Sequence, residues 1–263
     1  MGMVRVIVHG AFGKVGREVV QALNGQPDME LAGAIDLKAS NDRLPLPDGS
    51  GDVPLAINLE TLLKSTKPNV MVDFTVASAS MPAIRLAASN GISLVIGTTG
   101  LSAGEVGEIE RLTLEHDVGA VVAPNFALGA VLMIHLAEIA SKYLDWAEII
   151  ELHHQQKADA PSGTALSTAR LMAQARGKPF TQPGPSKEAP SRGKNVDGIA
   201  IHSVRLPGLL AHQEIILGAP GQTLTIRHDT VSRECYLPGV FLAIREVMKK
   251  KGLIYGLDKL LGL

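Results

Sequence analysis

Short apolar segments alternate with helical ones along the first half of the chain. Strands are predicted at 4–9, 31–35, 70–74, 93–96 and 119–123. Helices are predicted over 14–24, 81–90 and 102–116, and the first two end at Gly25 and Gly91. Near-continuous apolar strands that alternate with helices indicate a parallel sheet covered by helices on both faces.

The second half has a different pattern. Helices are predicted over 127–143, 164–176 and 240–251, with a strand at 146–154. Three strand-like runs without intervening helices suggest antiparallel pairing, at 199–205, 212–217 and 222–228. Residues 181–198 are rich in Pro, Gly, Ser and Lys and are predicted to form an extended loop, and loops of that length are more often functional or mobile than idle.

These patterns predict an α/β protein with two domains. A Rossmann-like, doubly wound parallel sheet is expected over residues 1–125, completed by residues 234–263. A smaller α+β domain with a mixed sheet is expected over residues 126–233, where it would bind the substrate.

Composition narrows the classes of partner. The 263 residues include 25 Lys+Arg and 26 Asp+Glu, so the net charge of −1 gives no general attraction to nucleic acid or to an anionic membrane. The uncharged stretch 118–134 contains Pro124 and Gly129 and is short for a membrane span, and the first residues lack a long apolar signal core. The single cysteine, Cys235, can form neither an internal disulfide nor a cysteine-based metal site, is expected to be a buried structural thiol, and fits a cytoplasmic location.

The first strand runs into a glycine-rich turn typical of dinucleotide binding. Gly10, Gly13 and Gly16 form a G-x-x-G-x-x-G variant between a predicted strand and a predicted helix, whose free N–H groups can hold a pyrophosphate. Asp36 ends the second strand, where a carboxylate can accept hydrogen bonds from ribose hydroxyls. Asp36 would repel a 2′-phosphate and favours NAD, while Lys14 and Lys38 offer a counter-charge that leaves NADP open.

Two further turns follow strands of the same predicted sheet. They cover 97–100 and 123–126, and both should face the ligand crevice at the carboxyl ends of the strands.

The densest polar cluster lies between residues 151 and 164. His153, His154 and Lys157 can all donate protons. Neighbouring strand residues point to opposite faces, so the two histidines should have different roles unless the strand ends there. Ser162, Gly163 and Thr164 open a helix whose free N–H groups can bind a carboxylate. Adjacent histidines are poorly spaced for one metal ion, so no metal is expected.

The sequence resembles the 4-hydroxy-tetrahydrodipicolinate reductase (dihydrodipicolinate reductase) family over essentially its whole length. The segment 151–165 carries most of this resemblance, supported by 10–16, 97–100, 123–126 and 202–214. It implies NAD(P)H-dependent reduction of 4-hydroxy-tetrahydrodipicolinate, a small cyclic dicarboxylic acid, to tetrahydrodipicolinate in lysine biosynthesis by the diaminopimelate route. It also implies a homotetramer that assembles through the sheet of the second domain.

The resemblance implies a role for each matching residue. His153 and Lys157 would donate protons, and His154, Gly163 and Thr164, with Ser162 beside them, would contact the substrate. The resemblance implies cofactor contacts from Gly10, Ala11, Phe12, Gly13, Lys14, Val15, Asp36, Gly97, Thr98, Thr99, Ala123, Pro124, Asn125 and Phe126. The glycine turn and the counter-charge add Gly16 and Lys38 to the expected cofactor site. Many relatives carry Arg after the ribose-binding acid, whereas this chain has Leu37. A strong preference for NADPH is therefore not expected.

Two other functions remain open on the residues alone. One is another two-domain NAD(P)-dependent dehydrogenase of a small acidic substrate, similar to aspartate dehydrogenase. The other is a redox sensor that binds NAD(H) without turnover, although no basic helix for DNA is evident.

Overall fold

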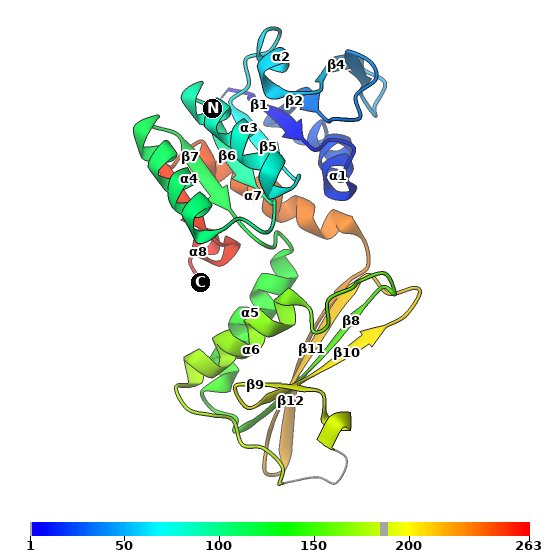
Figure 1. Cartoon of the computed structure of the whole chain (residues 1–263), viewed down its shortest axis with the longest axis vertical. Helices are drawn as coiled ribbons and strands as arrows, with labels where there is room; N and C mark the ends of the chain where they lie inside the picture. Colours follow the sequence, from blue (N-terminus) through cyan, green and yellow to red (C-terminus); the bar gives the residue numbers. More distant parts are fainter. Residues whose placement is uncertain (1, 185–188) are drawn as a thin grey trace. The chain divides into compact units, whose positions relative to one another are not determined.

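The computed structural model describes residues 2–184 and 189–263, and the chain divides into two compact units (Figure 1). Unit 1 contains the chain up to Leu128 together with Arg233–Leu263, and unit 2 is Gly129–Ser232. The sequence placed these boundaries at 125/126 and 233/234. No helix among the described residues is both long and apolar enough to cross a membrane.

Unit 1 is built on an eight-stranded sheet in the order β13-β7-β6-β5-β1-β2-β4-β3. Its strands are β1 (Val4–His9), β2 (Met29–Ile35), β3 (Arg43–Pro45), β4 (Asp52–Ala56), β5 (Val70–Asp73), β6 (Ser93–Ile96), β7 (Gly119–Val122) and β13 (Gly252–Tyr255). All neighbours pair in parallel except β3 and β4. Order and direction confirm the predicted doubly wound, Rossmann-like class.

Helices cover both faces of this sheet. They are α1 (Lys14–Leu23), α2 (Leu59–Leu63), α3 (Ala77–Ser89), α4 (Ala103–Glu115), α7 (Leu237–Val247) and α8 (Leu257–Leu261), with the 3₁₀ turn η2 at Arg233–Tyr236. Helices α2, α3 and α4 pack against Ile7, Met71 and Leu94, whose strand neighbours point to the face covered by α1 and α7. Burial on both faces explains why these strands are apolar throughout.

Several element boundaries differ from the sequence predictions. Helix α3 begins at Ala77 rather than residue 81, and Pro82 lies inside it rather than in its first turn. Helix α7 ends at Val247 rather than continuing to 251, and the turn after it leads into β13, which was not predicted. Strands β3 and β4 and helix α2 were not predicted, because such short elements carry little periodicity.

Unit 2 contains a five-stranded mixed sheet in the order β12-β11-β8-β10-β9. Its elements are α5 (Leu128–Ser141), β8 (Trp146–His153), α6 (Gly163–Arg176), the 3₁₀ turn η1 (Ala189–Arg192), β9 (Lys194–Val196), β10 (Ile199–Arg205), β11 (Ala211–Ala219) and β12 (Gln222–Thr230). Part of the predicted loop 181–198 is thus η1 and β9, and residues 185–188 lie outside the described residues. Helices α5 and α6 cover one face of the sheet, where Ile149, Ile201 and Ile215 form its core (Figure 1).

The pairing of the last three strands was only partly predicted. Strand β11 is antiparallel to β12, as expected. Strand β10 instead runs parallel to β8, which lies between β10 and β11. This pairing joins segments far apart in sequence, so the local spacing of strands carries no information about it.

The turn from β1 into α1 is closed by contact between backbone atoms. A Cβ atom at Gly16 would lie 2.1 Å from the carbonyl oxygen of Gly10, which is closer than nonbonded atoms approach. The glycine at this position therefore permits the turn itself.

We predict opposite effects for two glycine-to-alanine substitutions. Gly16→Ala should lower the free energy of unfolding by about 2 kcal/mol or more, because the backbone of the turn has to shift. Gly107→Ala, in the exposed middle of α4 with nothing within 4 Å of the new Cβ, should raise it by about 0.5–1 kcal/mol. Urea unfolding of both variants measures the difference, and equal effects would contradict the close contact at Gly16.

Candidate active site

The glycine turn of unit 1 has the geometry of an anion cradle. Gly10 adopts φ +83°, and a Cβ there would lie 2.6 Å from the carbonyl oxygen of Phe74. Gly13 caps α1 without a side-chain hydrogen bond, which leaves the first N–H groups of that helix uncapped by a side chain. Open N–H groups beside a turn with no room for side chains fit the pyrophosphate of a dinucleotide.

Asp36 ties the glycine turn to the end of β2. Its Oδ2 accepts a hydrogen bond of 2.8 Å from the backbone N–H of Phe12, and its Oδ1 accepts one of 2.9 Å from the N–H of Lys38. The carboxylate retains further lone pairs for ribose hydroxyls. Leu37, next to it, is 82% exposed.

Asp73, at the end of β5, joins the predicted cofactor turns. It is fully buried and accepts hydrogen bonds from Ser80, Thr98 Oγ1 (2.8 Å) and Thr75 Oγ1 (2.8 Å). His9 Nδ1, directly before the glycine turn, lies 2.8 Å from Asp73 Oδ1. One carboxylate therefore joins the ends of β5 and β6 by hydrogen bonds and lies beside the end of β1. Its role was not predicted.

The two other predicted cofactor turns meet at an aromatic contact. The rings of Phe74 and Phe126 pack edge to face with centroids 5.7 Å apart. A Cβ at Gly97 would lie 2.1 Å from the Phe74 ring, so glycine lets that ring approach the turn. Asn125 Oδ1 accepts a hydrogen bond from Ala127 N–H, which closes the second turn.

The predicted cofactor residues differ in exposure. Lys14, Lys38, Thr99 and Pro124 are exposed, whereas Gly10, Ala11, Gly16, Thr98, Ala123 and Phe126 are buried. Phe12, Gly13, Val15, Asp36, Gly97 and Asn125 are half-buried. The buried members can reach a ligand chiefly through their backbone atoms.

In unit 2, a buried glutamate holds the first histidine of the predicted cluster. Strand β8 ends at His153, whose Nδ1 lies 2.5 Å from Glu151 Oε2. Glu151 is fully buried, and the His153 side chain is only 14% exposed. The two side chains share one face of the strand because they are two residues apart.

Arg205, at the end of β10, binds the same carboxylate through two hydrogen bonds. Its Nη1 and Nη2 donate to Glu151 Oε2 and Oε1 at 2.8 and 2.7 Å. Nη2 also donates to the carbonyl oxygen of Asp159 at 2.7 Å, which fixes the loop after β8. Burial alone raises the pKa of Glu151, but the hydrogen bonds from His153 and Arg205 outweigh it and lower this pKa to about 2.

The start of α6 is attached to this carboxylate as well. Ser162 N–H donates to Glu151 Oε1 at 3.1 Å, and Ser162 Oγ accepts from Ala165 N–H. Ser162 is buried, so its place is to cap the helix, while Gly163 and Thr164 are exposed. The first N–H groups of α6 left open to a carboxylate are those of Gly163 and Thr164.

Lys157 and His154 lie on the loop between β8 and α6. Lys157 Nζ donates to Asp159 Oδ2 at 3.0 Å, and this hydrogen bond lowers the pKa of Asp159 despite the opposing effect of burial. His154 lies just beyond β8, so strand alternation does not determine its direction. Its Nδ1 is buried without a hydrogen-bond partner among the described residues.

Glu151 and Arg205 were not predicted as site residues. A signal for Glu151 exists in the sequence, because Ala147, Ile149 and Glu151 alternate along a strand and must share its buried face. A carboxylate at an inward position requires a cation, but nothing local identifies Arg205 as that cation.

No group of histidine, cysteine and carboxylate side chains within residues 2–184 and 189–263 could hold a metal ion. Cys235 is half-buried, whereas the sequence predicted a buried thiol.

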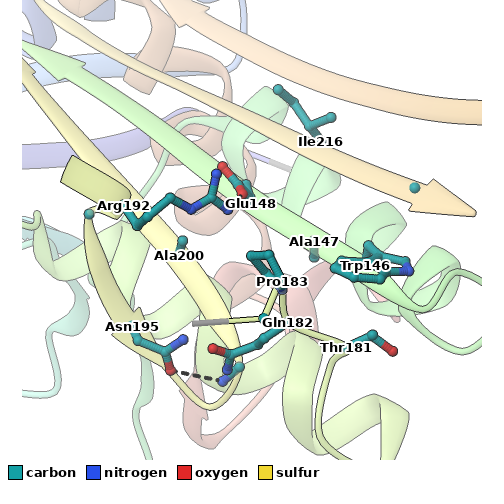
Figure 2. Close-up of a pocket in the computed structure, with 14 residues that line it drawn as sticks. Trp146, Ala147, Glu148, Thr181, Gln182, Pro183, Arg192, Asn195, Ala200 and Ile216 are labelled. Atoms are coloured by element: carbon teal, nitrogen blue, oxygen red, sulfur yellow. Dashed lines mark hydrogen bonds and ion pairs between the residues drawn. The ribbon is translucent and has the colours of Figure 1, made fainter. Parts of the chain in front are cut away.

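A separate cavity of about 710 Å³ lies on the face of the unit 2 sheet that α5 and α6 leave open. Figure 2 shows Arg192 extended toward Glu148 on β8, and Trp146, the first residue of that strand, also lines the cavity. Glu148 binds Arg192 and lies 2.9 Å from His202 Nε2. It therefore holds an arginine and a histidine as Glu151 does, on the opposite face of β8.

Comparison with known proteins covers both units. Residues 4–126 match the family model for the N-terminus of dihydrodipicolinate reductase, and residues 129–261 match the model for its C-terminus. A protein of Dehalococcoides mccartyi named 4-hydroxy-tetrahydrodipicolinate reductase is 57% identical over 263 residues, covering 100% of both chains. One of Moorella thermoacetica with the same name is 50% identical and covers 98% of both chains. The dipicolinate-bound dihydrodipicolinate reductase of Paenisporosarcina sp. TG-14 superposes with a TM-score of 0.86 at 41% identity, covering 98% of this chain and 99% of that one.

We predict that Glu151 stabilises the fold in a pH-dependent way. Its pKa is lowered on folding from an ordinary 4.5 to about 2, so its contribution is present above about pH 4.5 and is lost as the pH falls toward 2. Glu151→Gln should therefore be less stable than the wild type at neutral pH, by on the order of 3 kcal/mol. The gap should narrow with acidification, as measured by urea unfolding across this range, and a gap independent of pH would contradict the ionised state of Glu151.

Proposed function

This chain belongs to the dihydrodipicolinate reductase family and reduces 4-hydroxy-tetrahydrodipicolinate with a nicotinamide cofactor in lysine biosynthesis, and we propose which of its residues bind the reactants and move the protons. The carboxyl ends of the unit 1 strands bind the cofactor, and the end of β8 with the start of α6 binds the substrate. The observation that carries this assignment is the arrangement at the end of β8. There a histidine held by a carboxylate adjoins a loop with a lysine and the open N–H groups of a helix.

The cofactor is proposed to lie along the glycine turn. The N–H groups at the start of α1 bind its pyrophosphate, and Asp36 accepts hydrogen bonds from the adenosine ribose. The turns at 97–99 and 123–126 position the nicotinamide end. When bound, the cofactor supplies the hydride.

The substrate is proposed to be held by one of its carboxylates. The N–H groups of Gly163 and Thr164 bind that carboxylate, and His154 Nδ1, which has no hydrogen-bond partner among the described residues, supplies a further polar contact. A small dicarboxylate fits this site, which is consistent with the dipicolinate bound to the similar enzyme of Paenisporosarcina. Fixing the ring in this way reduces the entropic part of the barrier.

His153 and Lys157 are proposed to supply protons. Hydride arriving at one carbon of a conjugated imine leaves an enamine-like anion, which needs a proton at the neighbouring carbon. His153 can deliver this proton, and Lys157 stabilises or protonates the same developing charge or assists departure of the hydroxyl group.

The chain is also proposed to form a cytoplasmic homotetramer through the open face of the unit 2 sheet. Trp146 is 40% exposed on this face, and Ile150, Leu152 and Ile216 are only half-buried, which supports an apolar contact with another copy. A single cysteine suits a reducing compartment.

We predict that removing either proton donor slows turnover. Wild-type protein should oxidise NADH only with the condensation product of pyruvate and aspartate semialdehyde present. His153→Ala and Lys157→Ala should each lower kcat by about 10²-fold or more, the usual effect of a positioned proton donor. Affinity for NADH, measured by its fluorescence, should change little because both residues lie in unit 2.

His116→Ala, at the half-buried end of α4 in unit 1, and Lys142→Ala, at an exposed position after α5, serve as matched controls and should retain wild-type rates. Unchanged kcat in His153→Ala would remove the assignment of the proton donor. Binding of NADH without any turnover of this substrate would favour the redox sensor instead.

We predict a preference for NADH over NADPH. Asp36 opposes a 2′-phosphate, and the exposed Leu37 offers it no charge. Leu37→Arg should raise kcat/KM for NADPH by about tenfold, equivalent to about 1.4 kcal/mol from one charge-assisted contact, with little change for NADH. Leu37→Met is the neutral control. A wild type that already favours NADPH would show that Lys14 or Lys38 outweighs Asp36.

A further inference from the structure

Glu151 contacts three separate segments of unit 2 through a single carboxylate. Its oxygens accept hydrogen bonds from the end of β8, the end of β10 and the start of α6. We infer that Glu151 is the positioning residue of the reductase reaction, that it orients His153 for proton transfer, and that Arg205 fixes its carboxylate. This inference rests on the proposed role of His153.

The contact with His153 selects one ring nitrogen for chemistry. Nδ1 is occupied by Glu151 at 2.5 Å, so Nε2 is the nitrogen left to exchange a proton with the substrate. A carboxylate in this position fixes both the orientation and the tautomer of an imidazole, as it does in hydrolytic triads. With 14% of its side chain exposed, His153 has little freedom to turn elsewhere.

The contact with Ser162 connects Glu151 to the proposed substrate-binding site as well. Ser162 N–H directly precedes the open N–H groups of Gly163 and Thr164 and is bound to Glu151 Oε1. The proton donor and the proposed carboxylate cradle are thus built on one buried group. Misplacement of that group would displace both, and small errors of position are costly in rate.

Arg205 makes this arrangement possible. Two parallel hydrogen bonds hold the carboxylate in one plane, and a third, to Asp159, connects it to the loop that carries Lys157. Loss of either partner would leave a buried charge without compensation. Lysine cannot reproduce this bidentate geometry.

Glu148 provides a matched control within the same strand. It also binds an arginine and a histidine, but its side chain is 37% exposed and lies on the opposite face of β8, in the cavity of Figure 2. Glu148→Gln therefore removes an equivalent charge without touching His153 or α6.

The test compares Glu151→Gln, Glu148→Gln, His153→Ala and the double variant Glu151→Gln/His153→Ala. Steady-state kinetics give kcat and KM, and NADH fluorescence gives cofactor affinity. Glu151→Gln should lower kcat by about 10²-fold, with NADH affinity unchanged within about threefold. Because Glu151 acts on proton transfer through His153, kcat of the double variant should be no more than about threefold lower than that of His153→Ala, and the effect through Ser162 on the carboxylate cradle should appear in KM. Glu148→Gln should retain kcat within about twofold of the wild type, measured on protein that gel filtration shows to have the wild-type oligomeric state because Glu148 lies on the proposed tetramer face.

Three results would overturn the inference. One is wild-type kcat in folded Glu151→Gln, and another is multiplication of the two separate losses in the double variant. A full rate in His153→Ala would overturn the proposed proton donor as well, which distinguishes the two failures. If Glu151→Gln does not fold, Arg205→Lys takes its place, with an expected loss in kcat of about tenfold, and an unchanged kcat is then the contrary result.

Discussion

A carboxylate sealed from water is tolerated in a protein only where surrounding groups balance its charge and satisfy its lone pairs. Glu151 meets that condition with a bidentate arginine, a histidine nitrogen and a backbone N–H. Each of these donors comes from a different place in the chain, so the charge can be buried only when β8, β10 and α6 end or begin at one point. The geometry at the end of β8 follows from this single requirement.

Unit 1 uses the same principle with weaker donors. Asp73 is also fully buried at the carboxyl end of a strand, but apart from His9 beside it, the groups that donate to it are the hydroxyl groups of Thr75, Ser80 and Thr98. Hydroxyl groups rotate to suit their acceptor, whereas a guanidinium group presents a rigid fork. The turns around Asp73 and the end of β8 around Glu151 thus differ in the stiffness of the groups that hold them.

The sequence was sufficient for the features that arise from local periodicity. Strands such as β1 and β6, the glycine turn and the start of α6 could all be located, because each depends on neighbouring residues. Features set by distant pairing could not be located. The parallel register of β10 beside β8 and the approach of Arg205 to Glu151 join residues about fifty positions apart, and no local pattern encodes such a contact. Ser162 is an intermediate case. Its place at the helix start was predicted, but its N–H donates to Glu151 and is not free to bind a carboxylate of a ligand.

The discontinuity of unit 1 has a consequence for how the chain is made. Strand β13 pairs with β7, although all of unit 2 separates them in the sequence. Until translation on the ribosome has passed unit 2, the edge of β7 stays unpaired. Gly119, at the start of β7, also lacks the backbone of Val247 and Lys250 that later packs against it. An uncovered strand edge invites pairing with other chains. Unit 2, continuous in sequence, can fold while that edge is still open, so nascent unit 1 is the part that stays prone to aggregation for longer.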